Sequence, residues 1–201
     1  MKPRTVYREI TAAAILAVSY PIYFLIRQVG PYAEGRGEPV VLLHGFGGHQ
    51  SNLIALAAYL RMAGFRHVTS FQYPYRQSIA ESAGKLGRLI EKVGGKRGVH
   101  LIGHSLGGTI ARRFSFEAPQ AVRSLVTLCS PYSHDQESPF ELGLFGDEDP
   151  IVPPPQTIML NPRAFKQLIV LPHTGHLGIL YHRTTLELIE SELASNLKMA
   201  G

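Results

Sequence analysis

The segment Val99-His100-Leu101-Ile102-Gly103-His104-Ser105-Leu106-Gly107-Gly108 places the pattern G-x-S-x-G directly after an apolar run. The apolar run predicts a buried strand, and the spacing of apolar residues over 110–117 predicts a helix immediately after the pattern. Glycines at both ends of the pattern permit a tight strand-to-helix turn that lifts the serine hydroxyl clear of the sheet. Without that context the pattern is common in glycine-rich turns, but within it we interpret Ser105 as a nucleophile.

Strand-like and helix-like patterns alternate along the chain from Pro39 onward. Short apolar runs predict strands over residues 40–43, 68–73, 99–102, 125–128, 142–145 and 168–171. Helical spacing predicts helices over 53–60, 79–93 and 110–117, and a last helix beginning at residue 184. This alternation predicts an α/β fold with a doubly wound, mostly parallel sheet that binds ligands at the carboxyl ends of its strands.

The length and composition restrict the classes of protein to consider. A chain of 201 residues with 45% hydrophobic residues is long enough for one ordinary domain, which we assign to residues 31–201. The single cysteine excludes a disulfide framework and a zinc site built on several thiolates. The net charge of +5 comes from basic residues without clustered runs, so we expect no nucleic-acid partner, whereas an anionic membrane surface suits it.

The N-terminal segment, residues 1–30, differs from the rest of the chain. An uncharged run from Ile10 to Ile26 follows Lys2, Arg4 and Arg8, which is a membrane-targeting pattern. We predict an anchor that leaves the catalytic domain outside the cytoplasm. A cleaved signal peptide, giving a secreted enzyme, and a helix docked on the domain are the alternatives. Removal of this segment is expected to leave an active enzyme.

A serine nucleophile requires a histidine base and a carboxylate that orients the base. The chain contains three aspartates, of which Asp147 and Asp149 follow a predicted strand while Asp135 precedes one. His173 and His176 both follow the last predicted strand. The chain order serine, aspartate, histidine is that of α/β hydrolases.

On these residues the chain resembles the α/β-hydrolase-fold lipases and esterases, in particular the small lidless bacterial lipases, over residues 39–197. In that family the acid stands in a G-x-x-D-x-[IV]-[VI]-P context, which the resemblance assigns to Asp149. The histidine stands in a G-H-x-G context before the last helix, which selects His176 over His173.

The resemblance also implies an oxyanion hole. In the family one N–H comes from the residue after a His-Gly pair and the other from the residue after the nucleophile. The matching residues here are Phe46 and Leu106. By the same resemblance His44 and His104 have packing or hydrogen-bonding roles.

The chain leaves little room for a cap over the site. Only residues 129–148 separate the strand predicted at 125–128 from Asp149, whereas larger relatives insert a cap or lid in this region. We expect an open cleft whose rim is apolar, with Ile151, Val152 and Leu177 binding substrate. Phe46 and Leu106 add to this rim, and Ile179 and Leu180 are either rim or core residues.

We therefore expect a carboxylic-ester hydrolase that acts on short- to medium-chain acyl esters through an acyl-enzyme. An acyltransferase or perhydrolase with the same triad, or a catalytically silent membrane-tethered binding protein, are the alternatives. No cofactor is expected. The acidic run 147–149 lacks the spacing of a calcium loop, so we also expect no metal.

Overall fold

The computed structural model describes residues 1–26, 38–65, 67–74, 76–93, 98–132, 138–154 and 165–198. Within them the strands are β1 (Val40–Leu43), β2 (Val68–Phe71), β3 (Val99–His104), β4 (Val122–Leu128), β5 (Ser138–Gly146) and β6 (Phe165–Leu171). They form one six-stranded sheet in the order β2-β1-β3-β4-β5-β6, with every neighbouring pair parallel. The predicted α/β class and parallel sheet are confirmed.

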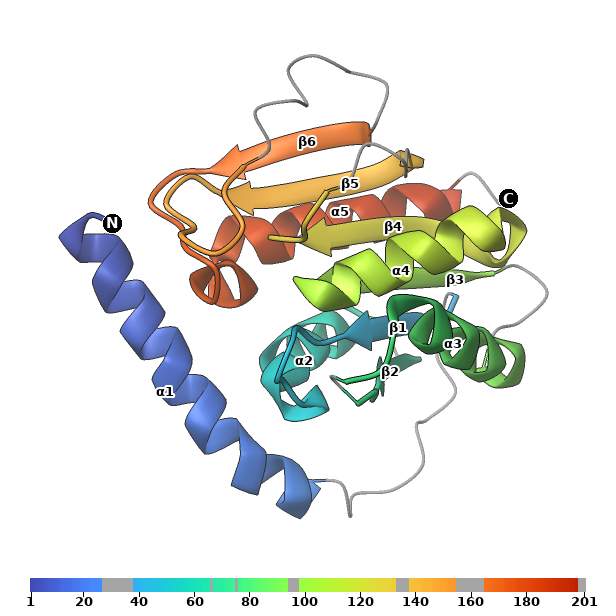
Figure 1. Cartoon of the computed structure of the whole chain (residues 1–201), viewed down its shortest axis with the longest axis horizontal. Helices are drawn as coiled ribbons and strands as arrows, with labels where there is room; N and C mark the ends of the chain where they lie inside the picture. The colour runs from blue at the N-terminus through green and yellow to red at the C-terminus, as the bar shows by residue number, and fades with distance from the viewer. Residues whose placement is uncertain are drawn as a thin grey trace.

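Helices cover both faces of the sheet (Figure 1). The helices are α1 (Pro3–Ile26), α2 (Ile54–Met62), α3 (Ile79–Val93), α4 (Leu106–Glu117) and α5 (Arg183–Lys198). Short 3₁₀ turns are η1 (Gln50–Leu53), η2 (Pro119–Ala121) and η4 (Gly178–Tyr181). Helices α3 and α4 pack on one face and α2 and α5 on the other, which gives two apolar cores.

The strand β1 shows why the central runs are apolar without alternation. Its successive side chains point to opposite faces of the sheet. Val40 and Leu42 enter the core beneath α2 and α5, whereas Val41 and Leu43 enter the core beneath α3 and α4. Since both faces are covered, every residue of this strand is buried and apolar.

The strand order brings the chemically important segments to one edge. The chain leaves β1 for β2 on one side and then crosses to β3 on the other, which creates a crevice at the carboxyl ends of β1 and β3. Figure 1 shows the arrowheads of β4, β5 and β6 pointing toward the same edge. No cap or lid domain lies over this edge among the residues that the structure describes; residues 133–137 and 155–164 fall outside that set.

The N-terminal helix α1 docks on the domain beside this edge, against η1 and η4 (Figure 1). Thr5, Ala12 and Ser19 recur every seven residues on one face of α1 and are buried. No helix in the described ranges is long and apolar enough to span a membrane. The predicted spanning anchor therefore finds no support in these residues. The uncharged run is the later part of a helix that begins at Pro3 and has Glu9 in contact with the domain.

A buried ion pair ties α4 to the sheet. Arg112 donates from Nε and Nη2 to the two carboxylate oxygens of Glu141 in β5, at 2.8 and 2.7 Å. Thr127 donates its hydroxyl proton to Glu141 at 2.5 Å, and Arg112 donates from Nη1 to the Pro131 carbonyl at 2.7 Å. Both charged side chains are almost fully buried. The pair positions the helix that follows Ser105.

We expect Glu141→Gln to lower the free energy of unfolding by about 3–5 kcal/mol, because the change leaves the buried Arg112 charge without its partner. Replacing the pair together, by Arg112→Met with Glu141→Leu, should cost much less, since neither charge remains buried. Denaturant titration of the three proteins measures the difference. If the double variant were as unstable as Glu141→Gln, the loss of stability would not come from the unpaired Arg112 charge.

Candidate active site

Ser105 lies between the last residue of β3 and the first residue of α4. Its φ of 52° and ψ of −123° are values that residues other than glycine rarely adopt. Such strain is found at the turn that presents the nucleophile in α/β hydrolases. The Ser105 N–H donates to the Leu128 carbonyl at 2.9 Å, which fixes the turn against β4.

The turn is tight enough to require glycine on each side of the serine. A Cβ added at Gly103 would lie 2.4 Å from the Cα of Gly108, inside the turn itself. A Cβ added at Gly107 would lie 2.5 Å from the carbonyl oxygens of Leu43 and His44 in and after β1. The two glycines of the motif therefore allow α4 to start directly against the strands.

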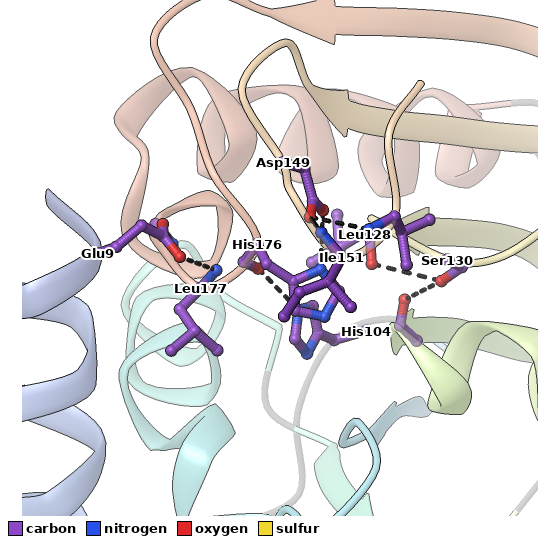
Figure 2. A network of polar contacts seen from close by, with 11 residues as sticks. Glu9, His104, Leu128, Ser130, Asp149, Ile151, His176 and Leu177 are labelled. Carbon is purple, nitrogen blue, oxygen red and sulfur yellow. Dashed lines mark hydrogen bonds and ion pairs between the residues drawn. The ribbon is translucent and has the colours of Figure 1, made fainter. Parts of the chain in front are cut away.

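His176 and Asp149 form a buried pair at the same edge of the sheet (Figure 2). His176 Nδ1 lies 2.7 Å from Asp149 Oδ2, although the two residues come from the loops after β6 and β5. Asp147 points elsewhere and accepts a hydrogen bond from the Thr174 N–H at 3.2 Å. Asp135 lies outside the described residues. Spacing alone did not decide between Asp147 and Asp149 as the acid. In the structure Asp149 is the one that contacts His176.

Four donors surround the Asp149 carboxylate. Besides His176, the backbone N–H groups of Ile151 and Val152 donate to Oδ1 at 2.8 and 2.9 Å. The buried Cys129 thiol donates the fourth hydrogen bond. Burial by itself raises the pKa of Asp149, but the hydrogen bonds from His176, Val152 and Cys129 outweigh it and the pKa is lowered. The carboxylate is therefore charged at neutral pH.

His104 supports His176 from the nucleophile side. Its Nε2 donates to the His176 carbonyl at 2.9 Å, and the two rings lie 4.8 Å apart between centroids. Burial is the main cause that lowers the pKa of His104, to about 4, and neighbouring His176 adds to it. His104 is thus neutral at pH 7 and carries its proton on Nε2. Within the described residues His176 makes its hydrogen bonds to Asp149 and His104, and none joins it to Ser105.

The second candidate histidine, His173, lies away from Asp149. Its Nδ1 is 3.3 Å from Glu148 Oε1, and its side chain is partly exposed. Donor atoms of His173, Asp147 and Glu148 lie within 4.8 Å of one another, as do those of Cys129, Asp149 and His176. The second of these groups is the hydrogen-bonded acid and base described above.

The two predicted oxyanion residues come from the loop after β1, which carries Phe46, and from the start of α4, which carries Leu106. The His44 ring stacks on the Tyr73 ring, with centroids 4.4 Å apart, and the Tyr73 hydroxyl donates to the His44 carbonyl. Phe46 follows in this loop with its side chain 70% exposed. Leu106 is the first residue of α4, so its N–H lies where the positive end of the helix dipole favours an anion.

The predicted rim residues separate into two groups. Ile151 is 66% exposed, and Val152 and Leu177 are half-buried, so these side chains lie at the surface beside the His176–Asp149 pair. Ile179 and Leu180 are buried in the core beneath α2 and α5. Of the two alternatives for Ile179 and Leu180, rim or core, the structure shows the core.

Buried neutral histidines give the fold an acid sensitivity. Burial lowers the pKa of His100 in β3 to about 4, as it does for His104. Between pH 6.5 and 4 the unfolded chain binds protons that the folded chain does not, so stability falls by roughly 3 kcal/mol per histidine as the pH drops. His100→Gln cannot titrate and should lose less stability over this range. Thermal unfolding at pH 7 and pH 4.5 tests this, and equal losses in both proteins would contradict it.

Two residues at the site were not found from the sequence. Cys129 donates to Asp149, and Glu9 of α1 accepts hydrogen bonds from the residues after His176. Cys129 follows β4 directly and so stands at the carboxyl edge, which is a signal the sequence does carry. Glu9 has no comparable signal, because it lies far from the other site residues in the chain.

Comparison with known proteins supports the fold. A family model described as the alpha/beta hydrolase fold matches residues 73–145, which include Ser105. Lipase 1 of Psychrobacter immobilis is 30% identical over 105 residues, 47% of this chain and 33% of the relative. A pimeloyl-[acyl-carrier protein] methyl ester esterase of Vibrio campbellii is 31% identical over 115 residues, 53% and 42% of the two chains.

A third relative, the dihydrolipoyllysine-residue acetyltransferase component of the acetoin cleaving system of Cupriavidus necator, is 37% identical over 106 residues, 48% of this chain. The chain spans between 27% and 42% of the length of these relatives.

Solved structures show the same fold over a larger part of the chain. An alpha/beta hydrolase from a sediment metagenome of the Mar Chica lagoon, MGS-MChE2, superposes with a TM-score of 0.67 at 21% identity, covering 81% of this chain and 93% of the other. A bacterial membrane phospholipase A gives a TM-score of 0.65 at 16% identity, covering 95% and 96%. The chain therefore has the α/β-hydrolase fold, and its resemblance to lipases and esterases is confirmed.

Proposed function

We propose that this α/β-hydrolase-fold protein is a carboxylic-ester hydrolase that uses Ser105, His176 and Asp149 for covalent catalysis. The observation that carries the proposal is the buried contact between His176 Nδ1 and Asp149 Oδ2, beside a serine at a strained strand-to-helix turn. With Nδ1 held by the carboxylate, the other ring nitrogen, Nε2, serves as the base toward the serine.

The reaction follows from these positions. The Ser105 oxygen attacks the ester carbonyl while His176 Nε2 takes the hydroxyl proton, and Asp149 stabilises the imidazolium. The N–H groups of Phe46 and Leu106 hold the negative oxygen of the tetrahedral intermediate. His176 then gives the proton to the departing alcohol, leaving Ser105 acylated. A water molecule, deprotonated by His176, releases the acid and restores the serine.

A series of p-nitrophenyl esters of increasing acyl length tests the proposal, with Ser105→Ala as the control. The expected result is saturable hydrolysis by the wild type and almost none by the variant. Equal activity in the two proteins, after exclusion of contaminants, would rule out Ser105 as the nucleophile.

The substrates that we propose are short- to medium-chain acyl esters. Ile151, Val152 and Leu177 offer an apolar rim beside the reacting groups, which suits an acyl chain better than a charged group. An open groove buries a long chain only partly, so each further CH₂ contributes less than the ~0.8 kcal/mol of complete burial. Chains below about twelve carbons should therefore be preferred.

The short connection from β4 to Asp149, residues 129–148, leaves no room for a lid and also predicts how the rate depends on substrate concentration. We expect the rate on a soluble ester to rise smoothly through its solubility limit, because no cover has to be displaced by an oil interface. Initial rates measured across that limit test this. A sharp increase on emulsion formation would show that a segment covers Ser105.

Acyl transfer is a second candidate, favoured by the similarity to an acetyltransferase component. The acylated serine would then pass its acyl group to an alcohol or thiol instead of water. Product analysis with a competing alcohol separates the two: free acid as the main product favours hydrolysis, and the new ester or thioester favours transfer.

We also propose that the protein works at a lipid surface outside the cytoplasm, with α1 lying on the membrane. The outward face of α1 exposes Val6, Ile10 and Val18, and Ile10 is 63% exposed. An apolar helix face near basic residues is typical of interfacial binding. Co-sedimentation with anionic vesicles tests the first part, and labelling of Ser105 in intact cells by a membrane-impermeant fluorophosphonate tests the second. No lipid binding and no labelling of intact cells would contradict both.

A further inference from the structure

The carboxylate of Glu9 contacts the segment that carries the proposed catalytic histidine. Its Oε2 accepts a hydrogen bond from the Leu177 N–H at 2.8 Å, and its Oε1 accepts one from the Gly178 N–H at 2.5 Å. Figure 2 shows Glu9 reaching from α1 toward Leu177, the residue next to His176. The only acidic residue of α1 thus contacts the two residues that follow the base.

The loop around His176 is shaped to admit this carboxylate. A Cβ added at Gly175 would lie 2.7 Å from Glu9 Cδ, and one added at Gly178 would lie 2.7 Å from Glu9 Oε1. The glycines before and after the histidine therefore leave the space that Glu9 fills. A side chain at either position would displace the carboxylate from the loop.

Further contacts join α1 to the same part of the site. Arg8 donates from Nη1 to the His173 carbonyl at 2.9 Å, and the backbone N–H of Lys2 donates to the Glu148 carboxylate. Glu148 immediately precedes Asp149. The first turns of α1 therefore contact the loop with the proposed base, and Lys2, directly before α1, contacts the loop with the proposed acid.

These contacts complete the support around His176. Asp149 holds the ring at Nδ1, His104 holds the carbonyl, and Glu9 holds the next two N–H groups along the chain. Asp149 and His104 belong to the loop after β5 and to β3, whereas Glu9 belongs to the N-terminal helix α1. Without Glu9 the backbone on the far side of His176 would lose both of its charged hydrogen bonds.

We propose that Glu9 is a positioning residue for catalysis, so that α1 belongs to the working active site. This rests on the proposed function, in which His176 transfers the proton of Ser105. Displacement of a catalytic group by about 1 Å costs on the order of 10²-fold in rate. We therefore expect Glu9→Ala, which removes both hydrogen bonds, to lower kcat by about 10- to 100-fold with little change in KM.

Glu9→Gln provides the graded variant in the full-length chain. The glutamine amide keeps one acceptor oxygen, while its NH₂ group cannot accept from a backbone N–H, so one of the two hydrogen bonds remains. Its kcat should fall between those of the wild type and Glu9→Ala. Glu117→Ala is the matched control, because it removes an exposed carboxylate that pairs with Arg113 at the last residue of α4, the end of that helix away from Ser105. Its kcat should equal that of the wild type.

Labelling of the nucleophile by a fluorophosphonate separates positioning from simple stabilisation. Positioning predicts that every Glu9→Gln molecule is eventually labelled, but with a smaller rate constant than the wild type. Complete labelling at the wild-type rate, or partial labelling at that rate, would overturn the proposal; the second result would mean that Glu9 only keeps molecules folded. A wild type that is neither labelled nor active would instead refute the proposed function itself.

Discussion

Ser105→Ala should lower kcat on p-nitrophenyl esters by about 10⁴–10⁶-fold, the largest effect of any single substitution in the chain. In the proposed mechanism the serine oxygen forms the acyl-enzyme. A water molecule in its place would not be held in position for attack on the ester. The residual rate would come from the oxyanion hole and substrate binding. Folding should be unaffected, since the change removes one hydroxyl from a side chain that is already almost buried.

Ser82→Ala is the matched control for this change. Ser82 is fully buried in α3, and its hydroxyl has no hydrogen-bond partner among the described residues. Loss of this hydroxyl should leave both activity and stability close to those of the wild type. A comparable loss of activity in Ser82→Ala would mean that the assay reports damage to the fold rather than loss of the nucleophile.

Asp149→Asn should lower kcat by about 10⁴-fold, because an amide cannot hold the imidazole in the tautomer that leaves Nε2 free to accept a proton. The carboxylate now accepts hydrogen bonds from donors that include the N–H groups of Ile151 and Val152. The NH₂ group of the amide could not accept from these donors. Kinetics at saturating substrate measure the effect. The change in KM should be small, since the carboxylate contacts the histidine rather than the substrate.

Asp147→Asn is the matched control for the acid. The two aspartates share one loop, but Asp147 contacts the Thr174 N–H and not His176. The asparagine amide at 147 still offers an acceptor oxygen to that N–H, so activity should change little. If Asp147→Asn proved the more damaging of the two, the acid would have to be reassigned.

The pattern of strands and the order of the elements could be predicted from the sequence. The buried central strands are short apolar runs, and β1 begins and ends where its apolar run does. Where strands contain polar residues the predicted bounds differ from the observed ones: the prediction 68–73 is longer than β2, and the prediction 142–145 is shorter than β5. The run at 142–145 was predicted as a strand, whereas β5 also includes Glu141, a buried charge whose partner Arg112 lies in α4. A partner so distant in the chain leaves no local signal.

The environment of Asp149 and the N-terminal helix mark the limit of sequence reasoning. The family context favours Asp149 as the acid, but the contact of Asp149 with the Cys129 thiol depends on how two loops meet. Glu9 stands directly before the uncharged run, where it resembles the polar flank of a membrane segment. Glu9 accepts hydrogen bonds from residues 177 and 178. These contacts argue against the expectation that residues 1–30 are dispensable for activity. Helix α1 packs against the domain, and removal of its first turns should slow catalysis.

The most direct test of the central claim is to trap the acyl-enzyme. Protein quenched in acid during turnover of p-nitrophenyl acetate, then digested and analysed by mass spectrometry, should carry one acetyl group on Ser105. Asp149→Asn should slow both formation and loss of this adduct, and Ser105→Ala should carry none. Rapid turnover with no adduct on Ser105, or with the acetyl group on another residue in step with turnover, would contradict covalent catalysis by this serine.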